Sequence, residues 1–375
     1  MKIVLTGGGT GGHIFPLISI IRDIKKKIPS NKKVEFFYVG PEDNYASALL
    51  KNEGVKVKNI CSGKIRRYWT PKVILKNLID IFFKIPISFC QSFYYLFVLA
   101  PDLVFSKGGF GGITTVFSSF LLRTPLFIHE SDVAPGLANK ISSWMALEIF
   151  VSFRETEYFP INKMILVGNP IRKKILQGNK ERAKENFEIT GGKPIVLVIG
   201  GSQGAKRVND NILNTFPSFL LDFEVIHQCG ENNIEEVWIE SGVILSKSLQ
   251  KYYHPRGFLS EKEIADAYSI ADIIVSRAGA GSIFEIAASN KPSILIPLPE
   301  SAQNHQVKNA YTYAEHGCCL VIEESNFTTG FFLERIQTLF EDKKKFRNMK
   351  KAIEEFSKPK ASEIIAQYIN SYLFL

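Results

Sequence analysis

One pattern occurs twice in this chain: a short apolar run, then closely spaced glycines, then a helical pattern. It opens the sequence as KIVLTGGGTGGHIFP and returns from Lys193 as KPIVLVIGGSQGAKRVN. Each copy is typical of a buried strand, a tight turn and a helix, the unit from which doubly wound parallel sheets are built. A chain of 375 residues also exceeds what one hydrophobic core usually serves. We therefore predict an α/β protein with two Rossmann-like, doubly wound domains.

Further strand patterns and one linker divide the chain. Apolar runs alternate with helical patterns after the first copy, at residues 34–39, 103–105 and 126–128. The Asn169-Pro170 dipeptide in VGNPIR disfavours helix and strand alike, which is typical of a linker. We predict an N-terminal domain, a C-terminal domain and a terminal helical segment free to pack back on the N-terminal domain, over residues 1–166, 167–345 and 346–375.

Glycine-rich loops occur four times, twice in each predicted domain. They are GGGTGGH from Gly7, KGGFGG from Lys107, GGSQGA from Gly200 and RAGAGS from Arg277. In a doubly wound sheet such loops lie at the carboxyl ends of strands, where ligands bind, and their glycines leave helix N–H groups open to a phosphate. A tight turn explains any single loop but is a poor explanation for four. We expect one cleft lined from both domains.

The first loop also matches the dinucleotide fingerprint G-x-G-x-x-G, which raises the possibility of a nicotinamide-dependent dehydrogenase. Such a site needs an acidic residue at the end of the second strand, to bind the ribose. Here Glu42 and Asp43 come only after the turn at Gly40-Pro41. This displacement argues against a dehydrogenase, and the lack of a Lys-Ser/Thr pair after the glycines excludes a Walker loop.

Two loop residues have both a structural and a chemical interpretation. Ser282 and Glu285 form an S-x-x-E sequence, which is typical of a helix capping box, although a carboxylate there could equally accept both hydroxyls of a ribose. His13 follows the first glycines and is either a loop residue or an imidazole placed for general-base catalysis beside a phosphate cradle. The spacing leaves both alternatives open in each case.

The net charge of +9 comes entirely from the front of the chain, where the first 84 residues hold 16 Lys/Arg and 6 Asp/Glu. This asymmetry indicates an anionic partner, either nucleic acid or a membrane surface, unless it is simply a solvated lysine-rich face.

The short apolar run before the first glycines does not resemble a signal peptide, so we expect a cytoplasmic start. The five cysteines and six histidines lack metal-site spacings, and we expect no metal and no cofactor.

The segment from Thr70 to Ala100 differs from its surroundings. Thr70-Pro71 predicts a helix start, and Pro86 is expected to interrupt the helix. The stretch from Ile85 to Ala100 is apolar and aromatic, but its 16 uncharged residues fall short of the roughly 20 that span a bilayer. We expect either a packing helix or one that lies in a membrane interface.

Taken together, these motifs resemble the MurG family of bacterial cell-wall glycosyltransferases. The resemblance rests on GGTGGHIFP, KGGFGG, IHESDVAPGLANK, VGNPIR, GGSQGAKRVN, SRAGAGSIFEIA and NHQVKNA, which occur in the family's order over nearly the whole chain. It implies the GT-B fold, in which two Rossmann-like domains face a cleft. The N-terminal domain would handle the acceptor, and the C-terminal domain would bind UDP-N-acetylglucosamine.

The resemblance also implies roles for individual residues. His13 is the first choice for the general base and Glu130 the second. Ser202 and its loop would approach the diphosphate, Leu259 the uracil, Glu285 the ribose and Gln306 the sugar, and Arg172 suits phosphate oxygens. The full set of predicted donor-binding residues is Thr10, Gly11, Gly12, Asp132, Arg172, Ser202, Leu259, Ala280, Gly281, Ser282, Ile283, Phe284, Glu285 and Gln306. Asp132 departs from the family, because many members have Asn there, and it is expected to contact the sugar.

The implied reaction is inverting transfer of N-acetylglucosamine to undecaprenyl-pyrophosphoryl-N-acetylmuramyl-pentapeptide in peptidoglycan synthesis. A lipid-linked acceptor implies a peripheral protein on the cytoplasmic face of the membrane, held by the apolar segment and by Lys64, Arg66 and Arg67. It implies an anionic membrane surface and other cell-wall synthesis proteins as partners, and no nucleic acid. The alternatives are a GT-B enzyme for another lipid, a UDP-sugar epimerase, a dehydrogenase, and a membrane-binding module without catalysis.

Overall fold

The computed structural model describes residues 1–8, 11–29, 31–63, 66, 70–156, 158–200 and 206–374, and the chain divides into two compact units. Unit 1 comprises Met1–Ile171 and Lys360–Leu375, and unit 2 comprises Arg172–Pro359. The sequence placed the boundaries at 166/167 and 345/346. The chain instead leaves unit 1 at Ile171 and returns to it at Lys360, so residues 346–359 belong to unit 2.

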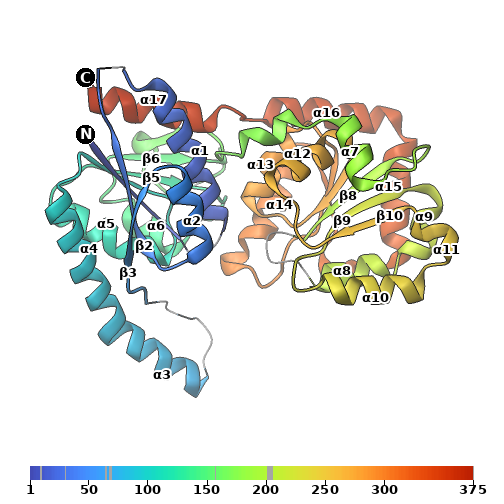
Figure 1. The fold of residues 1–375 in the computed structure, drawn as a ribbon, viewed down its shortest axis with the longest axis horizontal. Coiled ribbons are helices and arrows are strands. Elements are labelled where there is room, and N and C mark those ends of the chain that lie inside the picture. The colour runs from blue at the N-terminus through green and yellow to red at the C-terminus, as the bar shows by residue number, and fades with distance from the viewer. Residues whose placement is uncertain are drawn as a thin grey trace. The chain divides into compact units, whose positions relative to one another are not determined.

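Unit 1 is built on a parallel sheet with the order β3-β2-β1-β4-β5-β6-β7 in the described part of the chain (Figure 1). Its strands are β1 (Lys2–Thr6), β2 (Glu35–Pro41), β3 (Lys56–Ile60), β4 (Leu103–Ser106), β5 (Leu126–Glu130), β6 (Glu148–Val151) and β7 (Met164–Leu166). Its α-helices are α1 (Gly11–Lys27), α2 (Asn44–Asn52), α3 (Pro71–Ile79), α4 (Ile85–Leu99), α5 (Ile113–Leu121), α6 (Leu137–Ser142) and α17 (Ala361–Phe374). Single turns lie at Asp80–Lys84, Phe110–Gly112 and Ile161–Lys163.

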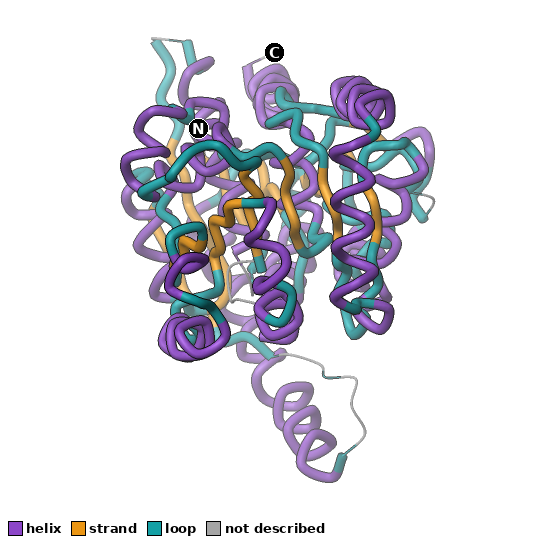
Figure 2. Tube along the Cα trace, turned by 90° about the vertical axis from the view of Figure 1, so that its right-hand side faces the viewer, coloured by secondary structure: helices purple, strands orange, loops and turns teal. Residues whose placement is uncertain are grey.

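Both faces of this sheet are covered, as a continuous apolar strand requires. Along β1, Ile3 and Leu5 join a core with α1, α2 and α17, whereas Val4 joins a second core with α4 and α5. Successive side chains of a strand point to opposite faces, so one strand serves both cores. Figure 2 shows the strands lying between helices.

The last helix of the chain belongs to unit 1. α17 packs along α1, and Ser362 donates a hydrogen bond of 2.6 Å to the buried carboxylate of Asp23. Tyr368 and Tyr372 make edge contacts with Phe150 and Phe127. The chain end therefore completes the N-terminal core.

Unit 2 has a second parallel sheet, ordered β10-β9-β8-β11-β12-β13 among the described residues. Its strands are β8 (Ile195–Ile199), β9 (Glu224–Gln228), β10 (Tyr253–Arg256), β11 (Ile273–Ser276), β12 (Ser293–Leu295) and β13 (Leu320–Val321). Its α-helices are α7 (Lys180–Phe187), α8 (Lys206–Leu213), α9 (Phe216–Asp222), α10 (Ile234–Ile244), α11 (Lys247–Gln250), α12 (Glu261–Ile270), α13 (Ala280–Ala288), α14 (His305–Glu315), α15 (Thr329–Glu341) and α16 (Lys343–Phe356). Single 3-10 turns lie at Lys173–Gln177, Ala302–Asn304 and Glu324–Asn326.

The segment that follows Thr70 is helical throughout residues 71–99. Thr70 is the N-cap of α3, as predicted, but Pro86 does not interrupt the helix. A π-helical turn at Asp80–Lys84 precedes it, in which the N–H of Ile85 bonds to the carbonyl of Asp80. Proline lacks an N–H and crowds the preceding turn, and a widened turn accommodates both effects. Within the described residues, no helix has the length and apolarity needed to cross a bilayer.

Candidate active site

In unit 1 the direction of strand addition reverses between β1 and β4. The chain proceeds from β1 outward to β2 and β3, then returns to the other side of β1 as β4. Thr6 at the end of β1 is in register with Ser106 at the end of β4. The first two glycine loops follow these strands, so they flank the point at which doubly wound sheets bind ligands.

These two loops meet at Gly109 and His13. Gly109 has a φ of +82°, and a Cβ there would lie 2.7 Å from the carbonyl oxygen of Gly8 and 3.2 Å from Nε2 of His13. Only glycine fits both this backbone angle and this spacing. The half-buried His13, in the first turn of α1, therefore lies beside the second loop. The other predicted residues of its loop are Gly11 and Gly12, which begin α1, and Thr10, which lies outside the described residues.

Glu130, the second choice for the base, organises the loop after β5. Its carboxylate is buried and accepts hydrogen bonds from the N–H of Asp132 (3.0 Å), the N–H of Gly136 (3.2 Å) and Nδ2 of Asn139 (2.8 Å). Burial, and then the negative charge of Asp132, raise the pKa of Glu130 to about 7. This geometry indicates that Glu130 fixes the conformation of the loop after β5. The half-buried Asp132 lies at the start of that loop.

Sequence reasoning missed Lys107, the first residue of the second glycine loop. It is 2% exposed, and its ammonium contacts His129 and Ser131 of the HES sequence. The signal that could have found it is a single lysine between a buried strand and two glycines, where no solvated position is expected.

One of the two acids after β2, Asp43, caps a helix. Asp43 is the N-cap of α2 and accepts a hydrogen bond of 2.9 Å from the N–H of Ala46. Its carboxylate therefore has a structural role, which agrees with the argument against a dehydrogenase.

Unit 2 repeats the arrangement at β8 and β11, where its own strand order reverses. Ile199 at the end of β8 is in register with Ser276 at the end of β11. The loops after these strands are the third and fourth glycine loops. Gly200 is described, whereas residues 201–205, which include the predicted Ser202, lie outside the described residues.

Arg172 and Glu285 form a bidentate ion pair within unit 2. Nε and NH2 of Arg172 lie 2.8 and 2.7 Å from the two carboxylate oxygens of Glu285, and the side chains are 17% and 11% exposed. Burial opposes the charge of Arg172, but attraction and hydrogen bonding by Glu285 raise its pKa overall. The two residues predicted to bind phosphate and ribose are therefore bonded to each other.

The capping-box interpretation of Glu285 is wrong. α13 begins at Ala280 with Gly279 as its N-cap, so Ser282 lies inside the first turn and makes no side-chain cap. A capping box does occur in unit 2, but between Ser260 and Glu263 at the start of α12. The first N–H groups of α13 have no acceptor within the helix, which makes its N-terminus suitable for a phosphate.

The remaining predicted donor residues are placed as follows. Ala280, Gly281 and Ser282 form the first turn of α13, and the side chains of Ile283 and Phe284 are buried in the core. Leu259 is buried, and its N–H points to Oε1 of Gln228 at 3.4 Å. Gln306, in the first turn of α14, accepts a hydrogen bond of 3.1 Å from the N–H of Leu298, which fixes its amide.

A charge network that the sequence analysis did not identify holds the loops beside α13. Arg277 follows β11 and lies 2.6 Å from Glu324, while its guanidinium also donates to the carbonyls of Ile296 and Pro297. Arg207 of α8 contacts both Glu324 and Glu300 at 2.6 Å. These bonds tie the 296–300 segment, and hence the Leu298 that holds Gln306, to the glycine loops.

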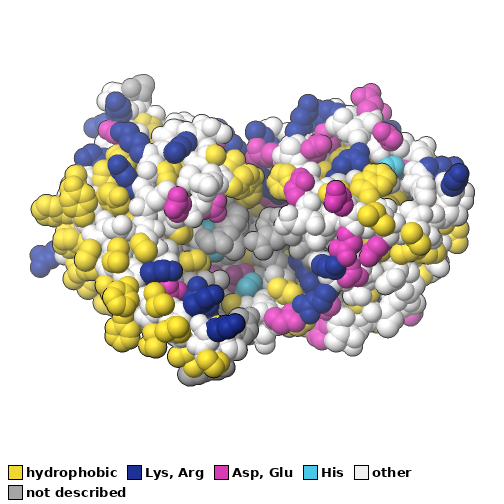
Figure 3. All heavy atoms as spheres, turned by 60° about the horizontal axis from the view of Figure 1, so that its bottom comes forward, with side chains coloured by type: hydrophobic (Ala, Val, Ile, Leu, Met, Phe, Trp, Pro, Cys, Tyr) yellow, Lys and Arg dark blue, Asp and Glu magenta, His cyan; other side chains and the backbone are white. Residues whose placement is uncertain are grey.

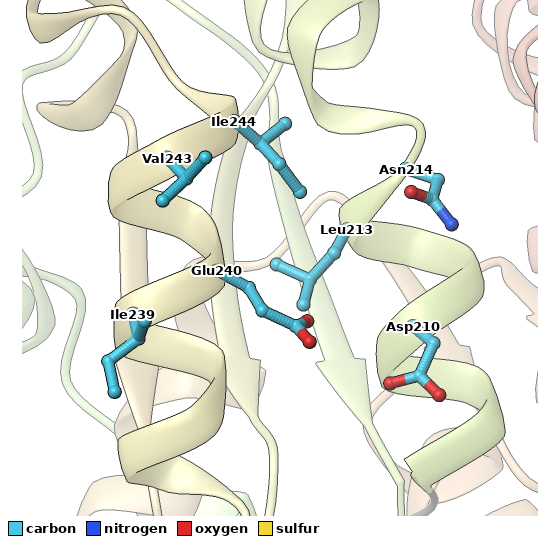
Figure 4. A pocket seen from close by; sticks show the side chains of 7 residues that line it. All are labelled: Asp210, Leu213, Asn214, Ile239, Glu240, Val243 and Ile244. Carbon is cyan, nitrogen blue, oxygen red and sulfur yellow. The ribbon is translucent and has the colours of Figure 1, made fainter.

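A groove of about 370 Å³ lies elsewhere on unit 2, between α8 and α10 (Figure 4). It is lined by Asp210, Leu213, Asn214, Ile239, Glu240, Val243 and Ile244. None of these residues belongs to the predicted donor site. The groove lies at the C-terminal end of α8, whereas the third glycine loop precedes its N-terminal end.

Unit 1 carries an apolar arm, which we define as the continuous helix over residues 71–99. The ribbon of Figure 1 and the tube of Figure 2 both show α3 extending away from the sheet, and none of its residues is buried. The exposed apolar side chains of the arm include Ile74, Leu75, Leu78, Ile79, Ile81, Phe82, Phe83, Ile87, Tyr94, Phe97 and Val98. Apolar side chains gather on unit 1 in Figure 3, with Lys and Arg among them.

The predicted charges near this arm are only partly described. Lys64 and Arg67 lie outside the described residues. Arg66 pairs with the buried Asp80 at 2.7 Å, and Lys84 contacts the same carboxylate at 2.9 Å. Arg66 therefore stabilises the π turn of the arm.

Comparison with known proteins identifies relatives of both units. The glycosyltransferase family 28 N-terminal domain matches residues 3–151, and the glycosyltransferase family 28 C-terminal domain matches residues 195–365. Curated relatives named UDP-N-acetylglucosamine--N-acetylmuramyl-(pentapeptide) pyrophosphoryl-undecaprenol N-acetylglucosamine transferase include proteins of Clostridium tetani and Lachnospira eligens. The Clostridium tetani protein is 38% identical to this chain, over 93% of this chain and 93% of its own length. The Lachnospira eligens protein is 37% identical, over 97% of this chain and 98% of its own length.

Solved structures show the same fold. Acinetobacter baumannii MurG aligns over 99% of both chains, with a TM-score of 0.74 and 22% identity. A UDP-GlcNAc 2-epimerase of Neisseria meningitidis aligns over 99% of this chain and 100% of its own, with a TM-score of 0.69 and 14% identity. The fold is therefore GT-B, but the fold alone does not separate a transferase from an epimerase. The sequence identity to the named transferases over nearly the full length makes this distinction. This chain belongs to the MurG family of UDP-N-acetylglucosamine-dependent N-acetylglucosaminyltransferases.

Proposed function

We propose that this chain transfers N-acetylglucosamine from UDP-N-acetylglucosamine to the 4-hydroxyl of undecaprenyl-pyrophosphoryl-N-acetylmuramyl-pentapeptide, with inversion at the anomeric carbon. The observation that carries the proposal is α13. Its first turn offers backbone N–H groups, and its next turn carries a carboxylate fixed by Arg172. A phosphate acceptor and a diol ligand on one helix suit a nucleoside diphosphate.

Arg172 serves this site by orienting Glu285. A carboxylate has about four lone-pair positions, and the guanidinium fork occupies two of them. The other two remain for the vicinal hydroxyls of the ribose. We therefore assign Arg172 to the positioning of Glu285, in place of the direct phosphate contact expected from the chemistry of its guanidinium.

In the proposed reaction, the muramyl hydroxyl attacks the anomeric carbon and gives its proton to His13. The bond from this carbon to the diphosphate oxygen breaks, and its electron pair leaves with UDP. Positive charge develops on the sugar and negative charge on the diphosphate, and the helix N–H dipoles of unit 2 stabilise the latter. Glu130 is already engaged by three donors. We therefore keep His13 as the base.

We assign the apolar arm to the acceptor's membrane. An amphipathic helix with lysines beside apolar side chains binds in the interface of an anionic bilayer. On α3, Lys72 and Lys76 accompany exposed side chains such as Leu75. The protein would thus act as a peripheral protein on the cytoplasmic face.

An acceptor panel tests the proposed function. Purified protein receives labelled UDP-N-acetylglucosamine with a short-chain muramyl-pentapeptide pyrophosphoryl lipid, with diacylglycerol, or with no acceptor. We expect labelled lipid product only with the muramyl lipid. Labelled diacylglycerol would indicate a different lipid substrate, and conversion of the donor to its C2 epimer without acceptor would indicate an epimerase.

A further inference from the structure

Lys107 is a buried cation in unit 1 with no role in the reaction described above. It follows the last residue of β4 and is 2% exposed. An ammonium is rarely buried unless its protons are bonded, because the loss of hydration is expensive. Its partners therefore show what the charge does.

Three acceptors surround Nζ of Lys107. Nδ1 of His129 lies at 2.7 Å, Oδ1 of Asn169 at 3.3 Å, and Oγ of Ser131 is also within hydrogen-bond distance. Nε2 of His129 lies 3.0 Å from the carbonyl oxygen of Gly168, which can only accept. Nε2 therefore carries the imidazole proton, and Nδ1 accepts from Lys107.

The charges around this cluster are consistent with a protonated lysine and a neutral histidine. Burial and then the charge of Lys107 hold the pKa of His129 well below its usual value. Burial lowers the pKa of Lys107 to about 8, while the facing carboxylates of Glu130 and Asp132 act in the opposite direction. The groups facing Lys107 from β5 and its following loop are thus two acids, a neutral imidazole and a hydroxyl.

The lysine connects two parts of unit 1 that are distant in sequence. On one side, Lys107 leads directly into Gly108 and Gly109, and Gly109 lies against the ring of His13. On the other side, it bonds to Asn169 directly and to Gly168 through His129. The 168–171 segment is the last part of unit 1 before the chain enters unit 2.

We propose that Lys107 is a positioning residue, whose ammonium fixes the turn at Gly108–Gly109 and thereby the placement of His13. The inference rests on the proposed role of His13 as the base. A positioning residue of this kind sets the rate of proton removal and leaves donor binding in unit 2 unchanged.

The test compares Lys107→Met with Lys163→Met. Met retains most of the buried carbon of Lys107 and removes its three bonds. Lys163 is a matched control, since its Nζ donates to the carbonyl of Ala146 at 2.8 Å, in the same unit but away from the loops. We expect kcat of Lys107→Met to fall about tenfold to a hundredfold, because small misplacements of reacting groups have effects of this size. The KM for UDP-N-acetylglucosamine should change much less than kcat, because most of the predicted donor residues lie in unit 2. Both parameters of Lys163→Met should stay within about twofold.

Two further readouts separate positioning from a general loss of structure. The kcat of the wild type should fall as the pH rises above about 8, and Lys107→Met should lack this alkaline limb. Hydrogen–deuterium exchange should increase in peptides covering 11–15 and 107–112 of Lys107→Met and remain unchanged in Lys163→Met. This readout needs no turnover, so it is informative even if the acceptor panel overturns the proposed function.

Several results would overturn the inference. They are a kcat within twofold of the wild type, a loss confined to donor KM, an alkaline limb retained in Lys107→Met, or unchanged exchange at 11–15. If Lys107→Met does not fold, Ser131→Ala deletes one acceptor and carries the same test. It should lower kcat about twofold to fivefold with little effect on donor KM, because the ammonium loses one of its three acceptors and keeps His129 and Asn169. No change in kcat would contradict the proposal.

Discussion

Arg172 and Glu285 face each other in unit 2 through two hydrogen bonds of 2.8 and 2.7 Å. The pair leaves half of the carboxylate's lone pairs for a ligand, which gives a direct prediction. Glu285→Ala should raise the KM for UDP-N-acetylglucosamine about tenfold to a hundredfold, because hydrogen bonds to charged groups contribute about 1.5–3 kcal/mol. The same substitution should abolish the preference for UDP-N-acetylglucosamine over its 2′-deoxyribose analogue, measured as the ratio of kcat/KM values.

The chain supplies a matched control for this pair. Arg182 and Asp266 form a second bidentate pair in unit 2, at 2.6 and 2.5 Å. Arg172→Met should raise donor KM, whereas Arg182→Met should lower thermal stability and leave donor KM unchanged. An equal rise in KM for the two variants would show that loss of any ion pair in unit 2 disturbs the site.

His13→Ala tests the assignment of the base. We expect kcat to fall by about 10² to 10⁴, the usual contribution of general-base catalysis, with little change in donor KM. Initial rates with saturating acceptor and donor provide the measurement. A fall of less than about tenfold would show that another group accepts the proton.

Glu130 gives a prediction about stability and pH. Its folded-state pKa of about 7 exceeds the value of about 4.3 in an unfolded chain, so between these pH values the folded protein holds a proton that the unfolded chain lacks. The stabilisation from this group is fully present below about pH 4 and is lost as the pH rises through 7. Glu130→Gln should therefore lose this dependence.

The measurement for Glu130 is the thermal midpoint of both proteins from pH 5 to pH 8. Gln also lacks one of the acceptors used by Asp132, Gly136 and Asn139, so it should be less stable throughout. The gap between the two midpoints should narrow as the pH rises. A gap that stays constant over this range would mean that Glu130 is already ionised in the folded protein at pH 5.

The apolar arm gives a prediction about membranes. Phe82 and Phe83 are 68% and 64% exposed, and replacing both with Ser should weaken vesicle binding at least tenfold, because burying a Phe contributes about 1.5–3 kcal/mol. Ile239 and Val243 on α10, 70% and 83% exposed, provide a control pair on unit 2. Their replacement with Ser should leave vesicle co-sedimentation unchanged. Equal recovery of the wild type with neutral and anionic lipids would contradict the contribution of the lysines.

Strong local signals made part of this structure predictable. The buried strands β1 and β8 and their glycine loops follow from short-range patterns, and Thr70 caps its helix as expected. The strand β3 was not predicted, because this edge strand reads KVKNI and is largely exposed, so it lacks an apolar run. The π turn before Pro86 was also missed, since the arm tolerates the proline by widening one turn.

The sequence points to candidate residues for the site but not to the interactions between them. Glu285 was singled out, but its choice between a cap and a ligand depends on where α13 begins, and S-x-x-E is compatible with both. Its bond with Arg172 joins residues far apart in the chain, which no local pattern encodes. The same holds for Lys107, whose partners at 129, 131 and 169 become neighbours only when β4, β5 and the segment after β7 lie at one sheet edge.

The most direct test of the central claim is transfer of labelled sugar from UDP-N-acetylglucosamine to a short-chain muramyl lipid in the presence of excess chelator, with the new linkage examined by NMR. The account predicts a β-1,4-linked product formed at an undiminished rate, because amide dipoles and fixed side chains stabilise the leaving diphosphate. An α-linked product, or a rate that collapses with chelator and recovers with a divalent cation, would contradict it.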